Sequence, residues 1–426
     1  MCRITPQNYK LSRIMVYATR YFFDTSFGLC AFLGFLNFCG WEVPGKKQAF
    51  CFALLSPCTN FSEIRLRFGS AKSKVLRPFT LHFTHLALIL HTEYNARTMT
   101  QIKDSWKAKG YVDEPVPQGV DLKAEIRRMC KEKNAIILAH YYTEGVLQDI
   151  ADFVGDSLGL AQQAAKTDAD IIVMCGVHFM GETNKILCPQ KKVLVPDLNA
   201  TCSLAESCPA DKFADFVKAH PGYQVVSYVN TTAAVKALTD VVVTSSNAKK
   251  IVETFLKDAK LIFGPDYNLG NYINAQTGRQ MLLWNGGCHV HERFSVTKLV
   301  ELKKEHPGAK VLVHPECRGA VVKLADVVGS TAALLKYAID SPCNTFLVVT
   351  ESGILHEMQK HCPDKHFIPV PPDDSTCGCN ECNYMRLCTL EKVYNTLRYE
   401  WPEIEVPAEV AARAIKPIER MLELSK

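Results

Sequence analysis

The sequence AIILAHYY at residues 135–142 is an apolar run that ends in polar residues, and the chain repeats this pattern twice more. The second copy ends in Tyr228-Val229-Asn230 and the third in His314-Pro315-Glu316. The spacing is 88 residues from His140 to Tyr228 and 86 residues from Tyr228 to His314. A second motif keeps the same spacings and places hydroxyl residues at Ser157, Ser245 and Thr331. Such periodicity indicates one supersecondary unit used three times.

The apolar runs predict buried parallel strands. Residues 171–174, 261–263 and 346–349 are continuously apolar, as in strands that are covered on both faces, and helical patterns separate them. We therefore predict an α/β fold with three three-layer α/β domains, each built on a parallel sheet and related by a pseudo-threefold axis. Ligands of such sheets bind beyond the carboxyl ends of the strands, so the three polar strand ends should face one central site.

The repeats also set the expected domains. We predict α/β repeats at residues 99–201, 202–288 and 289–382, followed by C-terminal helices at 383–426 that pack on the core. Within these segments, four helices are expected: one capped by Asp121 and ending near residue 133, one near 144–153, and two amphipathic helices at 385–397 and 408–424.

Residues 1–98 differ in composition from the rest of the chain. They carry 12 Lys and Arg against 4 Asp and Glu, whereas the remainder carries 37 against 40. Their apolar run at 27–41 is shorter than the roughly 18 residues needed to span a bilayer, and the layout of a signal peptide is missing. We interpret this segment as upstream sequence read in frame, with Met99 as the true start. An anchor or targeting segment is the alternative.

The balanced charge after residue 98 gives no electrostatic reason to expect binding to nucleic acid or to a membrane, both of which require clustered basic charge. Of the 18 cysteines, the thirteen after residue 98 are scattered through an α/β pattern rather than arranged as the framework of a short secreted domain. We therefore expect a reducing, cytoplasmic location.

Cysteines at repeat-equivalent positions suggest a metal centre. Cys202 and Cys288 are 86 residues apart, and a third ligand would come from Cys377, Cys379 or Cys382. Three thiolate ligands on an iron–sulfur cluster leave one iron open to bind and polarise a substrate oxygen. The C-x-C-x-x-C stretch alone fits structural zinc equally well. The C-x3-C-x2-C spacing of a radical S-adenosylmethionine site is absent from the sequence.

The polar strand ends supply candidates for catalysis. Glu316 lies beside His314 in the sequence, where a shielded carboxylate could act as a general base. Taken singly, Glu316 could be a solvated or capping residue and His140 a structural histidine, but three polar strand ends in register favour a site. Hydroxyl residues stand near expected helix starts, where they could bind an anion or act as N-caps: Ser157, Ser245, Ser330 and Thr331. His291 could contact a cluster, a phosphate or its own loop.

Seven short motifs follow Asp121, namely AHYY at 139–142, GDSL at 155–158, FMGET at 179–183, TCSL at 201–204, VTSS at 243–246, VHPE at 313–316 and VGST at 328–331. In these motifs, the chain from about Asp121 to the C-terminus resembles the bacterial quinolinate synthase family. The resemblance implies three α/β domains around one 4Fe-4S cluster with an open iron and three cysteine ligands, which fall by motif on Cys202, Cys288 and Cys382. The family often shows C-x-x-C-x-x-C here, so Cys377 and Cys379 have no assigned role.

The resemblance also implies a reaction, which condenses iminoaspartate with dihydroxyacetone phosphate to give quinolinate, phosphate and water for NAD biosynthesis. An aspartate oxidase or dehydrogenase would supply the iminoaspartate. The implied substrate-facing residues are His140, Tyr142, Ser157, Tyr228, Asn230, Ser245, His314, Glu316 and Thr331. We expect Glu316 to act as base and Tyr142 as acid, with His140 and His314 orienting the reactants. Two alternatives remain at this point: an iron–sulfur dehydratase of another hydroxy acid, and a metal-sensing or structural zinc protein.

Overall fold

The structure is a computed structural model that describes residues 104–373 and 380–426. The interpretation of residues 1–98 and of the start at Met99 therefore lies outside the described residues, as do Cys377 and Cys379.

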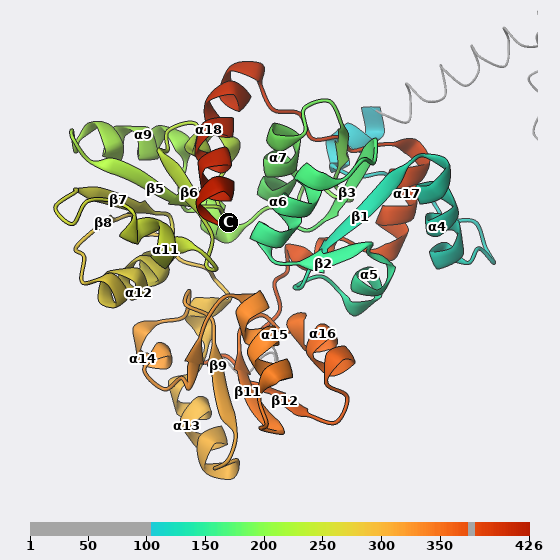
Figure 1. The fold of residues 1–426 in the computed structure, drawn as a ribbon. Coiled ribbons are helices and arrows are strands. Elements are labelled where there is room, and N and C mark those ends of the chain that lie inside the picture. Colours follow the sequence, from blue (N-terminus) through green and yellow to red (C-terminus); the bar gives the residue numbers. More distant parts are fainter. Residues whose placement is uncertain (1–103, 374–379) are drawn as a thin grey trace, which may run out of the picture. The chain divides into compact units, whose positions relative to one another are not determined.

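Three four-stranded sheets, all parallel, organise the described chain (Figure 1). The strands of the first sheet are β1 (Ala135–His140), β2 (Phe153–Gly155), β3 (Ile171–Cys175) and β4 (Lys192–Leu194). Those of the second are β5 (Gln224–Tyr228), β6 (Val241–Val243), β7 (Leu261–Gly264) and β8 (Leu282–Leu283). Those of the third are β9 (Lys310–Val313), β10 (Val327–Val328), β11 (Thr345–Val349) and β12 (His366–Pro369). The spatial orders are β2-β1-β3-β4, β6-β5-β7-β8 and β10-β9-β11-β12, so the predicted threefold repetition of parallel sheets is confirmed.

An aspartate at the same position of each repeat holds the first two strands together. Its Oδ2 accepts a backbone N–H bond from the first strand, in the pairs Asp152 with Ile137 at 2.8 Å, Asp240 with Val225 at 2.7 Å, and Asp326 with Val311 at 2.9 Å. The backbone N–H of each aspartate bonds in return to the carbonyl oxygen of the same partner. This two-way bond fixes the register and therefore decides which loop residues emerge at the strand ends.

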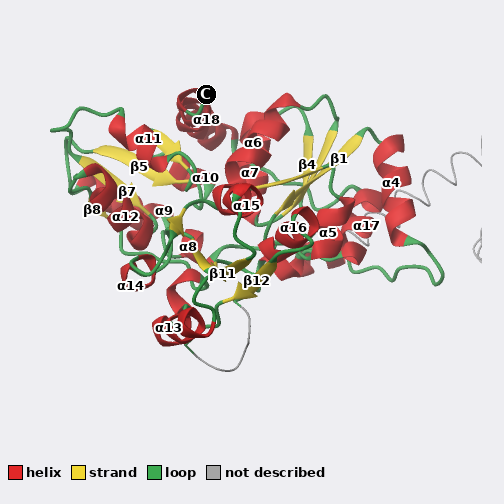
Figure 2. Cartoon of the chain, turned by 60° about the horizontal axis from the view of Figure 1, so that its bottom comes forward, coloured by secondary structure: helices red, strands yellow, loops and turns green. Residues whose placement is uncertain are grey.

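Helices cover both faces of each sheet. Ile137 packs in the core under α4 (Leu122–Glu132), whereas its neighbour Leu138 packs in the core with α6 (Ser157–Lys166) and α7 (His178–Leu187). The same alternation occurs in β5 and β9, and Figure 2 shows helices on either side of the strands. The predicted three-layer α/β architecture is confirmed.

The other helices follow the same plan and are mostly short. They are α5 (Gly145–Ile150), α8 (Ser203–Glu206), α9 (Ala210–Lys218), α10 (Ala233–Lys236), α11 (Ala248–Glu253), α12 (Tyr267–Thr277), α13 (Val296–Glu305), α14 (Gly319–Val322), α15 (Thr331–Asp340) and α16 (Ile354–His361), with 3-10 turns η2 (His291–Arg293) and η3 (Met385–Leu387). The helix predicted near 144–153 ends early as α5, because Asp152 pairs with β1 and Phe153 begins β2.

Two C-terminal helices pack back on the repeats (Figure 1). The expected helix at 408–424 is present as α18 (Ala408–Leu424), which contacts α7 and α10. The helix expected at 385–397 is divided into η3 and α17 (Leu390–Tyr399), because Thr389 caps α17 by accepting a bond from the N–H of Lys392 at 3.3 Å. Each sheet lies within one predicted repeat, while the domain boundaries themselves stay predictions.

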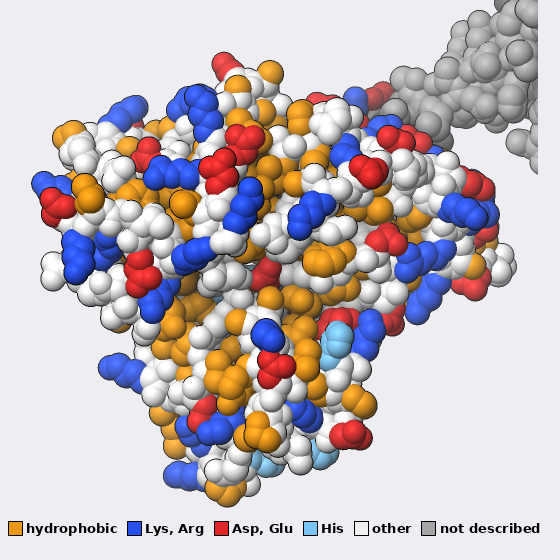
Figure 3. Space-filling model, viewed as in Figure 1, with side chains coloured by type: hydrophobic (Ala, Val, Ile, Leu, Met, Phe, Trp, Pro, Cys, Tyr) orange, Lys and Arg blue, Asp and Glu red, His pale blue; other side chains and the backbone are white. Residues whose placement is uncertain are grey.

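Charges of both signs mix on the protein surface. On the face drawn in Figure 3, Lys and Arg side chains are interspersed with Asp and Glu. Within residues 104–373 and 380–426, no helix has the length and apolar character to cross a bilayer.

Candidate active site

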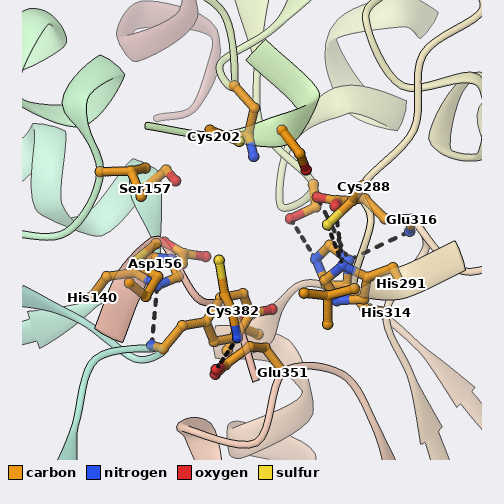
Figure 4. Close-up of a pocket in the computed structure, with 18 of the residues that line it drawn as sticks. His140, Asp156, Ser157, Cys202, Cys288, His291, His314, Glu316, Glu351 and Cys382 are labelled. Carbon is orange, nitrogen blue, oxygen red and sulfur yellow. Dashed lines mark hydrogen bonds and ion pairs between the residues drawn. The ribbon is translucent and has the colours of Figure 1, made fainter. Parts of the chain in front are cut away.

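One pocket collects the polar ends of all three sheets. It is lined by all twelve residues that the family resemblance implied for the site, namely His140, Tyr142, Ser157, Cys202, Tyr228, Asn230, Ser245, Cys288, His314, Glu316, Thr331 and Cys382. Figure 4 shows part of this arrangement, with side chains from all three repeats around one central space. The repeat positions are therefore brought together in one pocket, as predicted.

The three predicted cysteine ligands lie on three different loops. Cys202 precedes α8, Cys288 follows β8, and Cys382 precedes η3. Repeat-equivalent neighbours join the first two loops, since the Ser203 hydroxyl is 2.6 Å from Nδ1 of His289. The sulfur atoms of Cys288 and Cys382 point into the space between the loops (Figure 4). The loops thus converge without a covalent link between their thiols.

Burial disfavours free thiolates at these positions. It raises the pKa of Cys202 to about 12 and that of Cys382 to about 11, and it raises the pKa of Cys288 well above its usual value. A bound cation reverses this preference, because metal coordination stabilises the deprotonated sulfur. Three converging, half-buried thiols therefore fit a thiophilic metal centre better than free cysteines.

Glu316 is the central charged residue of the pocket. Its carboxylate is buried, and its Oε1 accepts a bond from the Tyr228 hydroxyl at 2.5 Å and lies 3.8 Å from Nδ1 of His314. Its Oε2 lies 3.2 Å from Nδ1 of His291. Burial opposes ionisation, but His291 and the hydrogen bonds from His291 and Tyr228 outweigh it and lower the pKa of Glu316. Glu316 is therefore a carboxylate at neutral pH.

A chain of hydrogen bonds links Glu316 to the first repeat. Nε2 of His291 lies 2.9 Å from the Thr350 hydroxyl, which lies 2.7 Å from the Tyr142 hydroxyl. Tyr142 also bonds to Thr331 at 2.7 Å. Burial raises the pKa of Tyr142 well above its usual value, so this phenol keeps its proton at neutral pH.

His291 joins the candidate metal ligands to the carboxylate. Its Nδ1 is 3.2 Å from the sulfur of Cys288, and donor atoms of Cys288, His291 and Glu316 all lie within 4.8 Å of one another. This trio could also hold a single metal ion by itself, since thiolate, imidazole and carboxylate are ordinary zinc ligands. Cys202 and Cys382 in the same pocket extend the donor set to three thiols.

Several groups offer bonds to an anionic ligand. Ser157 begins α6 and Thr331 begins α15, so two helix N-termini open into the pocket, where their free N–H groups favour negative charge. Ser245 lies 3.3 Å from Nε2 of His314. Oδ1 of Asn230 is buried and has no hydrogen-bond partner among the described residues. The pocket thus contains unmet polar capacity that a ligand could satisfy.

The structure adds residues that sequence reasoning missed. Thr350 and Glu351 follow β11, and both reach the site, Thr350 through His291 and Glu351 as a lining residue. Glu351 accepts the N–H of Cys382 at 3.0 Å, and burial raises its pKa to about 7 although Arg386 opposes this shift. The signal was available, because polar residues directly after a buried parallel strand lie at the ligand-binding edge of the sheet.

Ser330, and not Thr331, provides the cap of α15, since its side chain accepts a bond from the N–H of Ala333 at 3.3 Å. The cap of α6 is likewise Asp156 rather than Ser157. Ser157 and Thr331 are therefore left with their hydroxyls near the pocket, which favours the ligand-binding interpretation over the capping one.

A buried carboxylate, neutral histidines and three thiols at the common edge of parallel sheets define a metal- or cluster-dependent α/β enzyme. Residues 124–423 match the family described as Quinolinate synthetase A protein. The chain is 57% identical to the quinolinate synthase of Thermosynechococcus vestitus over 309 aligned residues. The alignment spans 72% of this chain and 97% of the relative. The quinolinate synthases of a Synechococcus species and of Chloroherpeton thalassium are 56% and 55% identical over 72% of the chain and 95% of each relative.

The chain therefore belongs to the quinolinate synthase family, which confirms the resemblance seen in its motifs. The family supports formation of quinolinate in NAD biosynthesis, and no finding favours the alternative of a dehydratase for another hydroxy acid. A requirement for iron and sulfur is consistent with this family and with the converging cysteines.

The buried histidines predict a pH dependence of stability for the cluster-free protein. Burial lowers the pKa of folded His140 to about 4, against about 6.5 in an unfolded chain. Between these values the unfolded state binds the proton that the folded state does not, so acidification lowers the free energy of unfolding by up to about 1.4 kcal/mol per pH unit for this group. His140→Gln should flatten the decline of the urea midpoint between about pH 6.5 and about pH 4. Equal slopes in variant and parent would contradict the expectation.

Proposed function

We propose that this chain condenses iminoaspartate with dihydroxyacetone phosphate to form quinolinate, releasing phosphate and water. The observation that carries the proposal is the convergence in one pocket of twelve predicted residues: three thiols, one buried carboxylate, two buried histidines, and hydroxyl and amide groups. Both substrates are anions, and the pocket offers two helix N-termini, three hydroxyl residues and a buried amide oxygen without a partner. An aspartate oxidase or dehydrogenase is the expected source of iminoaspartate.

The proposed cofactor is one 4Fe-4S cluster with Cys202, Cys288 and Cys382 as ligands. When bound, a cluster with three thiolate ligands supplies one open iron that can act as a Lewis acid on a substrate oxygen. The half-buried thiols support this assignment, because their partial burial leaves them protonated unless a cation stabilises the thiolate. His291, beside Cys288 and Glu316, would bring a hydrogen-bond donor next to both.

Proton transfers are assigned to the two ends of the hydrogen-bond chain. Glu316 is the proposed base, because it is ionised and lies in the pocket. Its donors Tyr228 and His291 weaken it as a base, so a substrate that displaces one of them would raise its affinity for a proton. Tyr142 is the proposed acid, since its phenol stays protonated and faces the same pocket.

The two buried histidines are assigned to orientation. Burial lowers the pKa of His140 to about 4 and that of His314 to about 3, so both rings are neutral at physiological pH. A neutral imidazole offers one donor and one acceptor, which suits it to hold a hydroxyl or carbonyl in place. Nδ1 of His140 already accepts the N–H of Tyr142 at 3.1 Å, which leaves its other nitrogen as a donor toward a ligand.

The test of the proposal is quinolinate formation by the protein purified and reconstituted without oxygen, supplied with dihydroxyacetone phosphate and freshly generated iminoaspartate. We expect quinolinate and phosphate in equal amounts. Brown, folded protein that forms no quinolinate would contradict the proposed reaction and would reopen the dehydratase alternative. Colourless protein that retains zinc would contradict the cluster. Assaying residues 99–426 in parallel tests whether the first 98 residues are needed.

Glu316→Gln should lower kcat by about 10²-fold or more, because the amide keeps the shape and the hydrogen-bond acceptor but cannot take a proton. Steady-state kinetics on cluster-loaded protein measures the change. The matched control is Glu357→Gln, a buried glutamate on α16 whose partners are Lys360 and His361 rather than pocket residues. The control should stay within about twofold of the parent, and unchanged turnover in Glu316→Gln would show that another group is the base.

Replacing any one of Cys202, Cys288 and Cys382 with alanine should prevent stable assembly of the cluster, since each supplies one of three protein ligands. Iron and sulfide content and visible absorption after reconstitution without oxygen measure the loss. Cys343→Ala is the control, because Cys343 is also partly exposed but does not line the pocket. Full cluster content in a Cys382→Ala protein would exclude Cys382 and direct attention to Cys377 or Cys379.

A further inference from the structure

Two buried side chains outside the pocket make the same bonds in two repeats. Gln148 on α5 and Lys236 on α10 are 88 residues apart, the spacing that also separates His140 from Tyr228. Gln148 is 1% exposed and Lys236 is fully buried. Neither lines the pocket.

Each side chain donates to the carbonyl oxygens on both sides of one pocket residue. Nε2 of Gln148 lies 3.0 Å from the oxygen of Tyr141 and 2.8 Å from that of Thr143, which flank Tyr142. Nζ of Lys236 bonds to the oxygen of Val229 at 2.8 Å and to the oxygen of Thr231, which flank Asn230. The same two loop positions are therefore held in both repeats, by an amide in one and an ammonium in the other.

The physical need for these bonds comes from the turn itself. A chain that leaves a parallel strand and turns away points its carbonyl oxygens out of the sheet, and buried carbonyls require donors. A donor on the following helix can bond to two of these carbonyl oxygens at once, which fixes the peptide groups on both sides of the central residue. Gln148 also reaches the carbonyl oxygen of Gly353 at 3.0 Å, which joins the loop of Tyr142 to the turn after Glu351.

The third repeat lacks this device. The equivalent position holds Val322, which cannot donate a hydrogen bond. There, the central residue is Glu316, and its own carboxylate is held by Tyr228 and His291. A donor behind the loop therefore occurs in the two repeats whose central residue is Tyr142 or Asn230.

We propose that Gln148 and Lys236 are positioning residues that set the placement of Tyr142 and Asn230 through the carbonyl oxygens flanking them. The inference rests on the proposed function, in which Tyr142 is the acid and Asn230 contacts substrate. Because Gln148 performs the task without charge, the hydrogen bonds of Lys236 and not its charge are what the loop requires. A buried ammonium costs free energy, and burial lowers the pKa of Lys236 to about 8.

The chain itself supplies the matched variant, since Lys236→Gln installs the side chain of the equivalent position and Lys236→Met keeps the length without donors. Hydrogen exchange of the cluster-loaded protein, read by mass spectrometry on peptides covering residues 228–231 and 140–143, measures each loop separately. Lys236→Met should raise exchange in the first peptide only, and Gln148→Met in the second only. Lys236→Met should also lower kcat/KM for quinolinate formation about tenfold or more, and Lys236→Gln should restore it to within about threefold.

Unchanged exchange and kinetics in Lys236→Met would overturn the proposal. So would a folded, cluster-loaded Lys236→Gln protein that loses as much as Lys236→Met, because the charge would then be what matters. If Lys236→Met does not fold, the variants Lys236→Gln and Gln148→Met decide. Exchange at 228–231 equal to that of the parent in Lys236→Gln, together with raised exchange at 140–143 in Gln148→Met, supports the proposal. Any other pair of results overturns it. A parent protein that forms no quinolinate contradicts the proposed function, while the exchange comparison still tests the positioning.

Discussion

The Glu316 carboxylate is buried where loops of the three sheets meet, and a buried negative charge is stable only where donors surround it. Tyr228 brings a donor from the second repeat, and His291 brings another from the loop after Cys288. His291 continues through Thr350 to Tyr142 of the first repeat. The arrangement of the pocket thus depends on satisfying one charge, and each repeat contributes a residue that would be poorly satisfied without the others.

The repeats share a backbone and differ in their chemistry. In each, the aspartate after the first crossover fixes the register of two strands. The loop that follows the first strand therefore begins at the equivalent position of the sheet in every repeat. The central residues of these loops are Tyr142, Asn230 and Glu316, which are a phenol, an amide and a carboxylate. Rigid parallel strands supply the positional precision that an active site needs, while the loops are free to vary.

Sequence reasoning identified much of the site because the repeats mark equivalent positions, and ligands of parallel sheets bind at the carboxyl ends of strands. It failed where a residue acts through a partner distant in the sequence. Thr350 bonds to both His291 and Tyr142, and Glu351 lines the pocket and accepts the backbone N–H of Cys382. It also placed helix ends imprecisely, as at residue 153, because local pattern alone does not reveal that Asp152 bonds back to a strand.

The sequence by itself determined the threefold α/β architecture, the family and twelve of the residues that line the pocket, because repeats, buried strand patterns and motifs can be recognised without knowing which residues touch. Tertiary structure alone decided which of these residues bond to one another. The buried pairing of Glu316 with Tyr228, the ionised state of that carboxylate and the neutral state of His140 all depend on burial and on contacts between residues that are not neighbours in the sequence. Such contacts leave no local signal, since desolvation and electrostatics act through space rather than along the chain.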